Sequence, residues 1–130
     1  MSEPAMGDAA PLTPAMFHIL LALAERERHG YDMIQAIDAA SGGGFKIGPG
    51  TLYRSIKQML ALGLIEESGE RPAPDQDDER RRYYRITAAG RRAASAEAAR
   101  LARLVSAARA RRLLGDFGGG EPAPGLGGAQ

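Results

Sequence analysis

Five polar side chains share one side of a predicted helix in the stretch IGPGTLYRSIKQMLALGLIEE, residues 47–67. They are Thr51, Tyr53, Arg54, Lys57 and Gln58. Arginine and lysine bind guanine edges and phosphates, glutamine pairs with adenine, and hydroxyl groups bind phosphate. An ordinary solvent-exposed helix face is also polar, so a nucleic-acid-binding face and a simple solvated face are both consistent with these residues. The large aromatic ring of Tyr53 on the polar side favours contact with nucleic acid.

The ends and the inner face of this helix are marked by its own residues. Pro49 suits the first helical position, where its missing N–H costs nothing, and Gly63 suits the left-handed residue that ends a helix. Apolar residues at helical spacing predict a buried face, which leaves the five polar side chains outward. The predicted buried face consists of Leu52, Ile56, Met59 and Leu60.

Two further helices are predicted before this one. Thr13 and Pro14 form a cap and first-turn pair, which begins a helix that runs to about residue 28. A second helix follows Gly30 and ends at the SGGG run of residues 41–44, after which residues 45–47 are expected to form a bridging strand. The predicted buried residues are Phe17, Leu20, Leu21 and Ala24 in the first helix and Met33, Ile34 and Ile37 in the second.

Two strand-like segments, residues 64–67 and 82–87, follow the third helix. The polar, proline-containing segment between them cannot be core, so they pair most simply as an antiparallel hairpin with a long tip. Thr87 then caps an alanine-rich helix from about residue 88 to residue 114. The predicted fold class is mainly α with a small antiparallel β-hairpin, a winged helix-turn-helix followed by a long helix. In such a fold the third helix enters a DNA groove and the hairpin touches the backbone.

Charge is segregated in the second half of the chain, although the net charge of all 130 residues is only +1. Residues 65–79 hold seven acids against one base, whereas residues 80–112 hold eleven arginines against one acid. We predict phosphate contacts from the hairpin arginines Arg80, Arg81 and Arg82, because a guanidinium fork suits phosphate oxygens. The alternative is that some of these arginines neutralise the adjacent acidic tip.

The last predicted helix carries an apolar seam with alternating steps of four and three residues. No earlier segment of the chain obviously requires so long a helix to cover it. The seam is therefore predicted to be a dimerisation surface that packs against a second copy. Packing on the chain's own first helix is expected over part of its length. The predicted homodimer interface is Ala94, Ala98, Leu101, Leu104, Val105 and Ala108.

Catalytic and metal-binding patterns find little support in the sequence. Without cysteine there is no thiolate nucleophile and no cysteine-based zinc site, and His18 and His29 lack spaced carboxylate partners. The acidic segment PAPDQDDE, residues 72–79, resembles a calcium loop because Asp75, Asp77 and Glu79 would be its first, third and fifth residues. It has Arg80 where that loop requires glycine and Ile86 where it requires glutamate. We therefore predict neither an enzyme nor a cofactor or metal site.

The composition fits one domain with a modest core, since 44% of the residues are hydrophobic. No apolar run is long enough to span a membrane, and the first residues lack the order of a signal peptide, so a soluble cytoplasmic protein is expected. Residues 12–87 are expected to form the DNA-binding domain and residues 88–114 the dimerisation helix. The segments 1–11 and 115–130 are expected to be disordered tails, because they are dominated by glycine, proline and alanine.

Three stretches together resemble the PadR family of bacterial transcriptional regulators: HGYDMIQAI at 29–37, GPGTLYRSIKQMLALGLIE at 48–66 and RRYYRITAAGR at 81–91. The resemblance implies a dimeric winged helix-turn-helix repressor that binds a palindromic operator in double-stranded DNA and is often released by a small aromatic effector. It also implies roles for single residues. Thr51, Tyr53, Arg54 and Lys57 fall on the DNA-reading helix, Tyr31 falls near the DNA backbone, and residues 80–82 fall on the wing.

The sequence departs from this family in two ways. The acidic insertion PAPDQDDE would repel phosphates if it lay against them, so it must point away or lower the affinity. The chain also has no tryptophan, so an aromatic effector would find no indole to stack on. An alternative function is a winged-helix module that binds an acidic protein through the arginine-rich final helix. A further hypothesis adds a ligand cavity between two C-terminal helices, lined by Leu101, Leu104, Val105 and Phe17.

Overall fold

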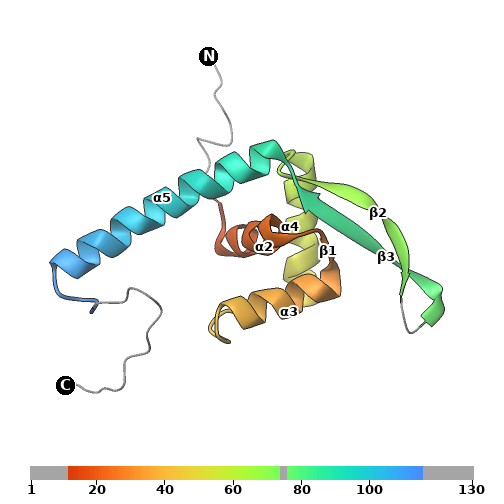
Figure 1. Ribbon diagram of the computed structural model, residues 1–130, viewed down its shortest axis with the longest axis horizontal. Coiled ribbons are helices and arrows are strands. Elements are labelled where there is room, and N and C mark those ends of the chain that lie inside the picture. Colours follow the sequence, from red (N-terminus) through yellow and green to blue (C-terminus); the bar gives the residue numbers. More distant parts are fainter. Residues whose placement is uncertain (1–11, 74–75, 116–130) are drawn as a thin grey trace, which may run out of the picture. The chain divides into compact units, whose positions relative to one another are not determined.

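The computed structural model describes residues 12–73 and 76–115, which form three helices, a three-stranded antiparallel sheet whose first strand lies between the first two helices, and a long final helix (Figure 1). This order confirms the predicted fold class. Residues up to 97 belong to one compact unit, and the part of the final helix from residue 98 onward belongs to another. The helices are α2 (Pro14–Glu25), α3 (Gly30–Ala40), α4 (Pro49–Ala61) and α5 (Ala88–Ala110), and the strands are β1 (Arg28–His29), β2 (Ile65–Ala73) and β3 (Gln76–Ile86).

Helix α2 begins as predicted and buries a different face. The Thr13 hydroxyl accepts a hydrogen bond from the Met16 N–H at 3.1 Å, with proline in the first turn. Leu21 and Ala24, which were predicted to be buried, are exposed. Because this segment is apolar on nearly every side, its spacing cannot select one face, and packing against α3, α4 and β3 decides the matter. The buried residues are Ala15, Met16, Ile19, Leu20, Ala22 and Leu23.

Helix α3 follows the prediction closely. Met33 and Ile37 are buried and Ile34 packs partly against the core. The helix ends at Ser41, and Gly42 and Gly43 follow with φ angles of 63° and 82°, which favour glycine. The expected bridging strand at residues 45–47 was wrong, because these residues form a connection without strand pairing that places Ile47 in the core.

Helix α4 has the boundaries that its residues predict. Pro49 lies in the first turn, and Gly63 takes a φ of 76° just after the helix. The Leu64 N–H then donates to the Met59 carbonyl at 2.9 Å, which closes the helix end. Leu52, Ile56 and Met59 are buried as predicted, whereas Leu60 is 37% exposed and does not belong to the inner face.

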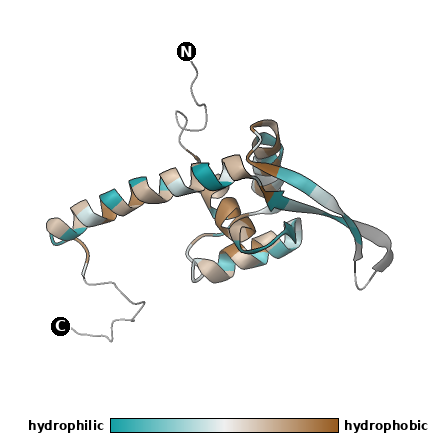
Figure 2. Ribbon diagram, turned by 45° about the horizontal axis from the view of Figure 1, so that its top comes forward, coloured by the Kyte–Doolittle hydropathy of each residue, from teal (hydrophilic) through white to brown (hydrophobic). Residues whose placement is uncertain are grey.

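The sheet has the order β1-β3-β2, with all pairs antiparallel. The first of these strands was not predicted, because two residues carry no periodic pattern. The long loop expected at the hairpin tip was also wrong, since β2 and β3 stay paired as far as Ala73 and Gln76. Figure 2 shows the described part of this hairpin as mainly hydrophilic, in contrast with the hydrophobic α2. Cross-strand pairs such as Glu70 opposite Arg82 explain how polar residues form strands here.

Helix α5 is joined to the rest of its unit at its first turn. The Thr87 hydroxyl accepts a hydrogen bond from the Gly90 N–H at 3.0 Å, as the predicted cap requires, and donates one to the Gly63 carbonyl at 2.7 Å. The helix ends at Ala110, four residues before the predicted end. The largest fully buried side chains of the core are Ile19, Leu20, Leu23, Met33, Ile37, Leu52, Met59 and Ile65.

Candidate nucleic-acid interface

The outward face of α4 carries all five polar residues that the sequence singles out. Thr51, Tyr53, Arg54, Lys57 and Gln58 are exposed. Arg54 is held in one orientation by the preceding turn, because its Nη2 donates to Thr51 Oγ1 at 3.3 Å. The five residues therefore lie on one accessible surface.

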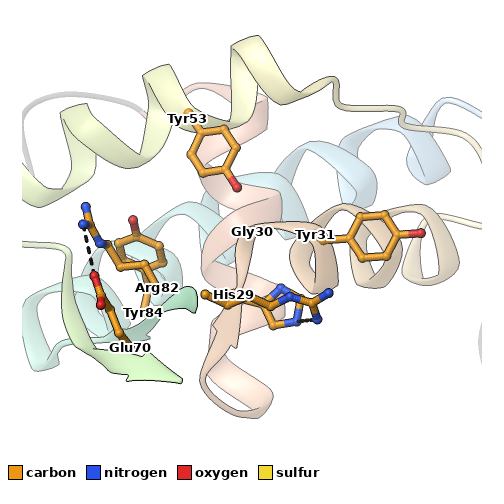
Figure 3. A pocket seen from close by; sticks show the side chains of 8 residues that line it. His29, Gly30, Tyr31, Tyr53, Glu70, Arg82 and Tyr84 are labelled. Atoms are coloured by element: carbon orange, nitrogen blue, oxygen red, sulfur yellow. Dashed lines mark hydrogen bonds and ion pairs between the residues drawn. The ribbon is translucent and has the colours of Figure 1, made fainter. Parts of the chain in front are cut away.

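Tyr53 does not project freely from this face. Its hydroxyl lies against Gly30 at the start of α3 (Figure 3), where an added Cβ would sit 2.1 Å from the tyrosine oxygen. Glycine is therefore required at residue 30 for this approach, although its backbone angles are ordinary. Tyr53 keeps 51% of its surface exposed, so it connects the outward face of α4 to the first turn of α3.

A cavity of about 500 Å³ lies beside Tyr53, between α3, α4 and the hairpin (Figure 3). Tyr31 lines it and is 59% exposed, with its hydroxyl accepting a hydrogen bond from Gln35 Nε2 at 3.3 Å. Tyr84 is buried there, and burial raises the pKa of its hydroxyl, with the Arg82 charge opposing the rise. The hydroxyl therefore stays protonated at neutral pH and can donate a hydrogen bond. The lining residues are His29, Gly30, Tyr31, Tyr53, Glu70, Arg81, Arg82 and Tyr84.

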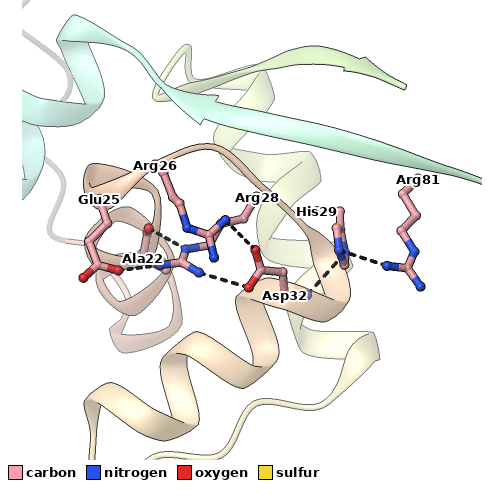
Figure 4. A network of polar contacts seen from close by, with 7 residues as sticks. All are labelled: Ala22, Glu25, Arg26, Arg28, His29, Asp32 and Arg81. Atoms are coloured by element: carbon pink, nitrogen blue, oxygen red, sulfur yellow. Dashed lines mark hydrogen bonds and ion pairs between the residues drawn. The ribbon is translucent and has the colours of Figure 1, made fainter. Parts of the chain in front are cut away.

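His29 has a structural role that the sequence did not reveal. Its Nδ1 accepts a hydrogen bond from the Asp32 N–H at 3.3 Å and so caps α3 (Figure 4). Its Nε2 lies 3.2 Å from Arg81 Nη1, and its ring makes a T-shaped contact with the Tyr83 ring, with the centroids 5.1 Å apart. Burial, and then the charge of Arg81, lowers the pKa of His29, while Asp32 acts in the opposite direction. The ring is therefore neutral at physiological pH and joins α3 to β3.

Arg28 fixes the turn between α2 and α3 (Figure 4), a role that was also missed. It is a buried residue, and its Nε donates to the Ala22 carbonyl at 2.9 Å while its Nη1 pairs with Asp32 Oδ1 at 3.0 Å. Its Nη2 pairs with Glu25. Asp32 accepts a second arginine, Arg26, at 3.1 Å. This network sets how the start of α3, with its cavity residues, is placed relative to α2.

The wing, defined here as the β2–β3 hairpin of residues 65–86, has its described arginines in polar pairs. Arg82 contacts two carboxylates, Glu67 and Glu70, and Arg85 pairs with Glu66 at 2.7 Å. The acids in these pairs belong to β2 and not to the acidic tip of residues 72–79 that was expected to neutralise the arginines. The side chain of Arg80 and those of the acidic tip lie outside the described residues. The phosphate contacts predicted for Arg81 and Arg82 would have to form beside or in place of these pairs.

The start of β2 is bound to the turn between α2 and β1. Glu27 accepts hydrogen bonds from Ser68 and from Arg71 Nη2, the latter at 3.0 Å. The bond from Ser68 has the largest effect and the bond from Arg71 the next largest, and both lower the pKa of Glu27. The Arg71 guanidinium also lies over the Tyr83 ring, 4.0 Å from its centroid. Strand β2 is thereby held to the helical part independently of strand pairing.

The six seam residues of α5 differ in their surroundings. Ala94 packs partly against the core of its own chain. The expected packing of this helix on the first helix stays a prediction. Leu104 and Val105 are 55% and 42% exposed. Ala98 is exposed, and Leu101 and Ala108 are half-buried. The exposed part of the seam is available to a second chain, and the dimer remains a prediction.

Within residues 12–73 and 76–115 no three histidine, cysteine, aspartate or glutamate side chains are grouped so that they could hold a metal ion. Over the same residues no helix combines the length and the hydropathy of a membrane span.

Comparison with known proteins gives consistent matches. Residues 19–96 match the family described as "Transcriptional regulator PadR-like family". The "Transcriptional regulator Rv3488" of Mycobacterium tuberculosis is 37% identical over 98 residues, which cover 75% of this chain and 80% of that protein. An "Uncharacterized 37.1 kDa protein in transposon TN4556" of Streptomyces fradiae is 34% identical over 90 residues, covering 69% of this chain. The chain spans only 24% of that second protein's length.

Solved structures with the same fold are also found. A PadR family transcription regulator from Clostridium difficile superposes with a TM-score of 0.63 at 18% identity, covering 77% of this chain and 99% of that one. Bacillus subtilis PadR in complex with operator DNA gives a TM-score of 0.52 at 19% identity, covering 59% of this chain and 42% of that one. At these identities the likeness shows the fold.

Proposed function

The chain belongs to the transcriptional regulator PadR-like family, and we propose that it is a homodimeric, sequence-specific DNA-binding repressor. The observation that carries this proposal is the outward face of α4, where five exposed side chains suited to bases and phosphates stand together. The Bacillus subtilis neighbour in complex with operator DNA supports the same role for this fold. Helix α4 would enter the major groove, and the wing would lie near the backbone.

Dimerisation through α5 is part of the proposal. The exposed Leu104 and Val105 lie next to one another on a helix whose apolar residues recur in steps of four and three. Two copies would present their α4 helices to successive major grooves, about 34 Å apart, and the operator would be palindromic. Release by a planar aromatic compound belongs to the same proposal, and a compound that binds the native protein would raise its unfolding temperature.

The proposal is tested by selecting and sequencing genomic fragments bound by the purified full chain at about 50 mM salt, a permissive concentration. The expected result is a small set of fragments that share a two-fold symmetric motif and bind two chains per site. No affinity for any fragment under these conditions would reject the proposal and favour the alternative, a winged-helix module that binds protein.

Arg54→Ala is expected to weaken binding to the selected fragment by roughly tenfold to a hundredfold, because an arginine that reads a base contributes about 1–3 kcal/mol. Fluorescence anisotropy on the selected fragment and on a scrambled duplex measures both affinity and specificity. Arg92→Ala is the matched control, since it removes the same charge from an exposed position on α5. Equal affinities of the two variants would contradict the role of α4 as the reading helix.

Gly30→Ala is expected to lower operator affinity about fivefold while changing the free energy of unfolding by less than about 1 kcal/mol. The new Cβ would meet the Tyr53 hydroxyl at 2.1 Å, and the flexible ring would swing away from α3. A double-mutant cycle with Tyr53→Ala provides the control. In the Tyr53→Ala background the Gly30 substitution should have no further effect, and a full second loss would show that Tyr53 is not the residue displaced.

A further inference from the structure

The wing is unusual for a DNA-binding hairpin because it is not basic. Residues 65–86 contain seven carboxylates and five arginines, a net charge of −2. A segment with this balance is not attracted to phosphates as a whole, so any contact with DNA depends on single arginines and on what holds them.

Arg82 is held by two carboxylates at once. Its Nε lies 3.1 Å from Glu67 Oε2 and its Nη2 lies 3.3 Å from Glu70 Oε2, as Figure 3 shows for the second pair. Glu70 stands directly opposite Arg82 in the strand register. The hydrogen bond that Arg82 donates to Glu70, and then the negative charge of Glu67, raises the pKa of Arg82. All three side chains are about half exposed, at 55% for Arg82 and 47% for each carboxylate, so the pairs lie at the surface.

This triad borders the surface that would face DNA. Arg82 and Glu70 line the same cavity as Tyr53 of α4 and Tyr31 of α3 (Figure 3). A DNA backbone lying across the outward face of α4 would therefore bring a phosphate close to the Arg82 guanidinium. The phosphate would compete with Glu67 and Glu70 for the same donors, since a guanidinium offers only a few N–H groups in one plane.

We propose that Glu67 and Glu70 set the affinity of this protein for DNA by restraining Arg82, the wing arginine beside the α4 surface. This inference rests on the proposed function. DNA phosphate is the competing partner, and binding transfers Arg82 from the two carboxylates to the phosphate. Because exposed ion pairs are weak, the restraint lowers affinity without preventing the exchange. The protein would thus release DNA more readily than the number of its wing arginines suggests.

The test measures operator affinity for Glu67→Gln and Glu70→Gln, in which the side chain keeps its size and loses its charge. Each variant is expected to bind roughly twofold to fivefold more tightly at about 100 mM salt, the range for one exposed ion pair.

Glu66→Gln is the matched control. It removes one carboxylate from the same strand, next to Glu67, but its partner is Arg85. Because side chains alternate along a strand, this pair points to the opposite face of the hairpin from Arg82. Glu66→Gln should therefore give only the small gain due to the long-range charge.

A second control separates local from long-range effects. In an Arg82→Ala background, Glu70→Gln should give no gain beyond that of Glu66→Gln. Equal gains in affinity for Glu66→Gln and Glu70→Gln, or a gain that persists in Arg82→Ala, would contradict the proposed restraint of Arg82. The proposed DNA-binding function would not be contradicted by either result. If the unmodified protein binds none of its genomic fragments at about 50 mM salt, the proposed function fails and the restraint fails with it.

Discussion

Replacing Gly90 with alanine is expected to lower the free energy of unfolding by about 3 kcal/mol or more, the range for steric conflicts that the backbone cannot relieve. An added Cβ would lie 2.1 Å from the Leu64 carbonyl oxygen and 2.9 Å from Ile86 Cγ1. The carbonyl cannot move easily, because it accepts a hydrogen bond from the Thr87 N–H at 3.1 Å. The first turn of α5 would have to lift off the junction between α4 and β2.

Chemical denaturation of the purified variant measures this effect. Gly50→Ala is the matched control, since Gly50 also lies in the first turn of a helix and its added Cβ would meet nothing within 4 Å. That control is expected to be unchanged or more stable by up to about 1 kcal/mol, because alanine favours the helix. If both variants unfolded at the same denaturant concentration, the close packing of Gly90 on Leu64 would be refuted.

The second large effect is expected for Arg28→Met, which should cost about 3 kcal/mol of stability, as for the loss of one partner of a buried ion pair. Methionine keeps most of the volume and removes the donors. The Ala22 carbonyl and the Asp32 carboxylate would then lose their contacts at 2.9 Å and 3.0 Å in the interior of the α2–α3 turn. The loss is costly because Asp32 would keep only the exposed Arg26 as a partner and the Ala22 carbonyl would lose its bond from Arg28.

Arg26→Met tests whether burial causes this effect. Arg26 contacts the same Asp32 carboxylate at 3.1 Å, but 60% of its side chain is exposed. Its replacement is expected to change the free energy of unfolding by less than about 1 kcal/mol. Thermal and denaturant unfolding of both variants gives the comparison. A loss of similar size for Arg26 and Arg28 would mean that the charge on Asp32, and not the buried position of Arg28, governs the stability of the turn.

Local patterns predicted α4 well and α2 poorly, and the difference has a physical cause. In α4 apolar residues alternate with polar ones, so Leu52, Ile56 and Met59 could only point inward. In α2 nearly every residue from 15 to 24 is apolar, and the spacing of Phe17 and Leu21 fitted a helix stripe without fixing the buried side. Leu21 is 45% exposed because the neighbouring elements cover the face with Ile19 and Leu20.

The candidate site was only partly predictable for a similar reason. The outward residues of α4 follow from helical spacing within one element. His29 and Arg28 could not be identified, because each looks like an ordinary polar residue at a turn until its partners are known. The contact of His29 with Arg81 joins residues 52 positions apart, and that of Glu27 with Arg71 joins residues 44 positions apart.

By itself the sequence determined where the four helices begin, their order with the β2–β3 hairpin, and the polar face of α4. These features depend on caps, on proline and glycine, and on periodicity, which act over a few neighbouring residues. Only the tertiary structure decided that Tyr53 rests on Gly30, that Arg82 is shared by Glu67 and Glu70, and that Gly90 packs on Leu64. Such contacts join segments far apart in the chain, so they depend on strand register and helix packing, which no local pattern contains.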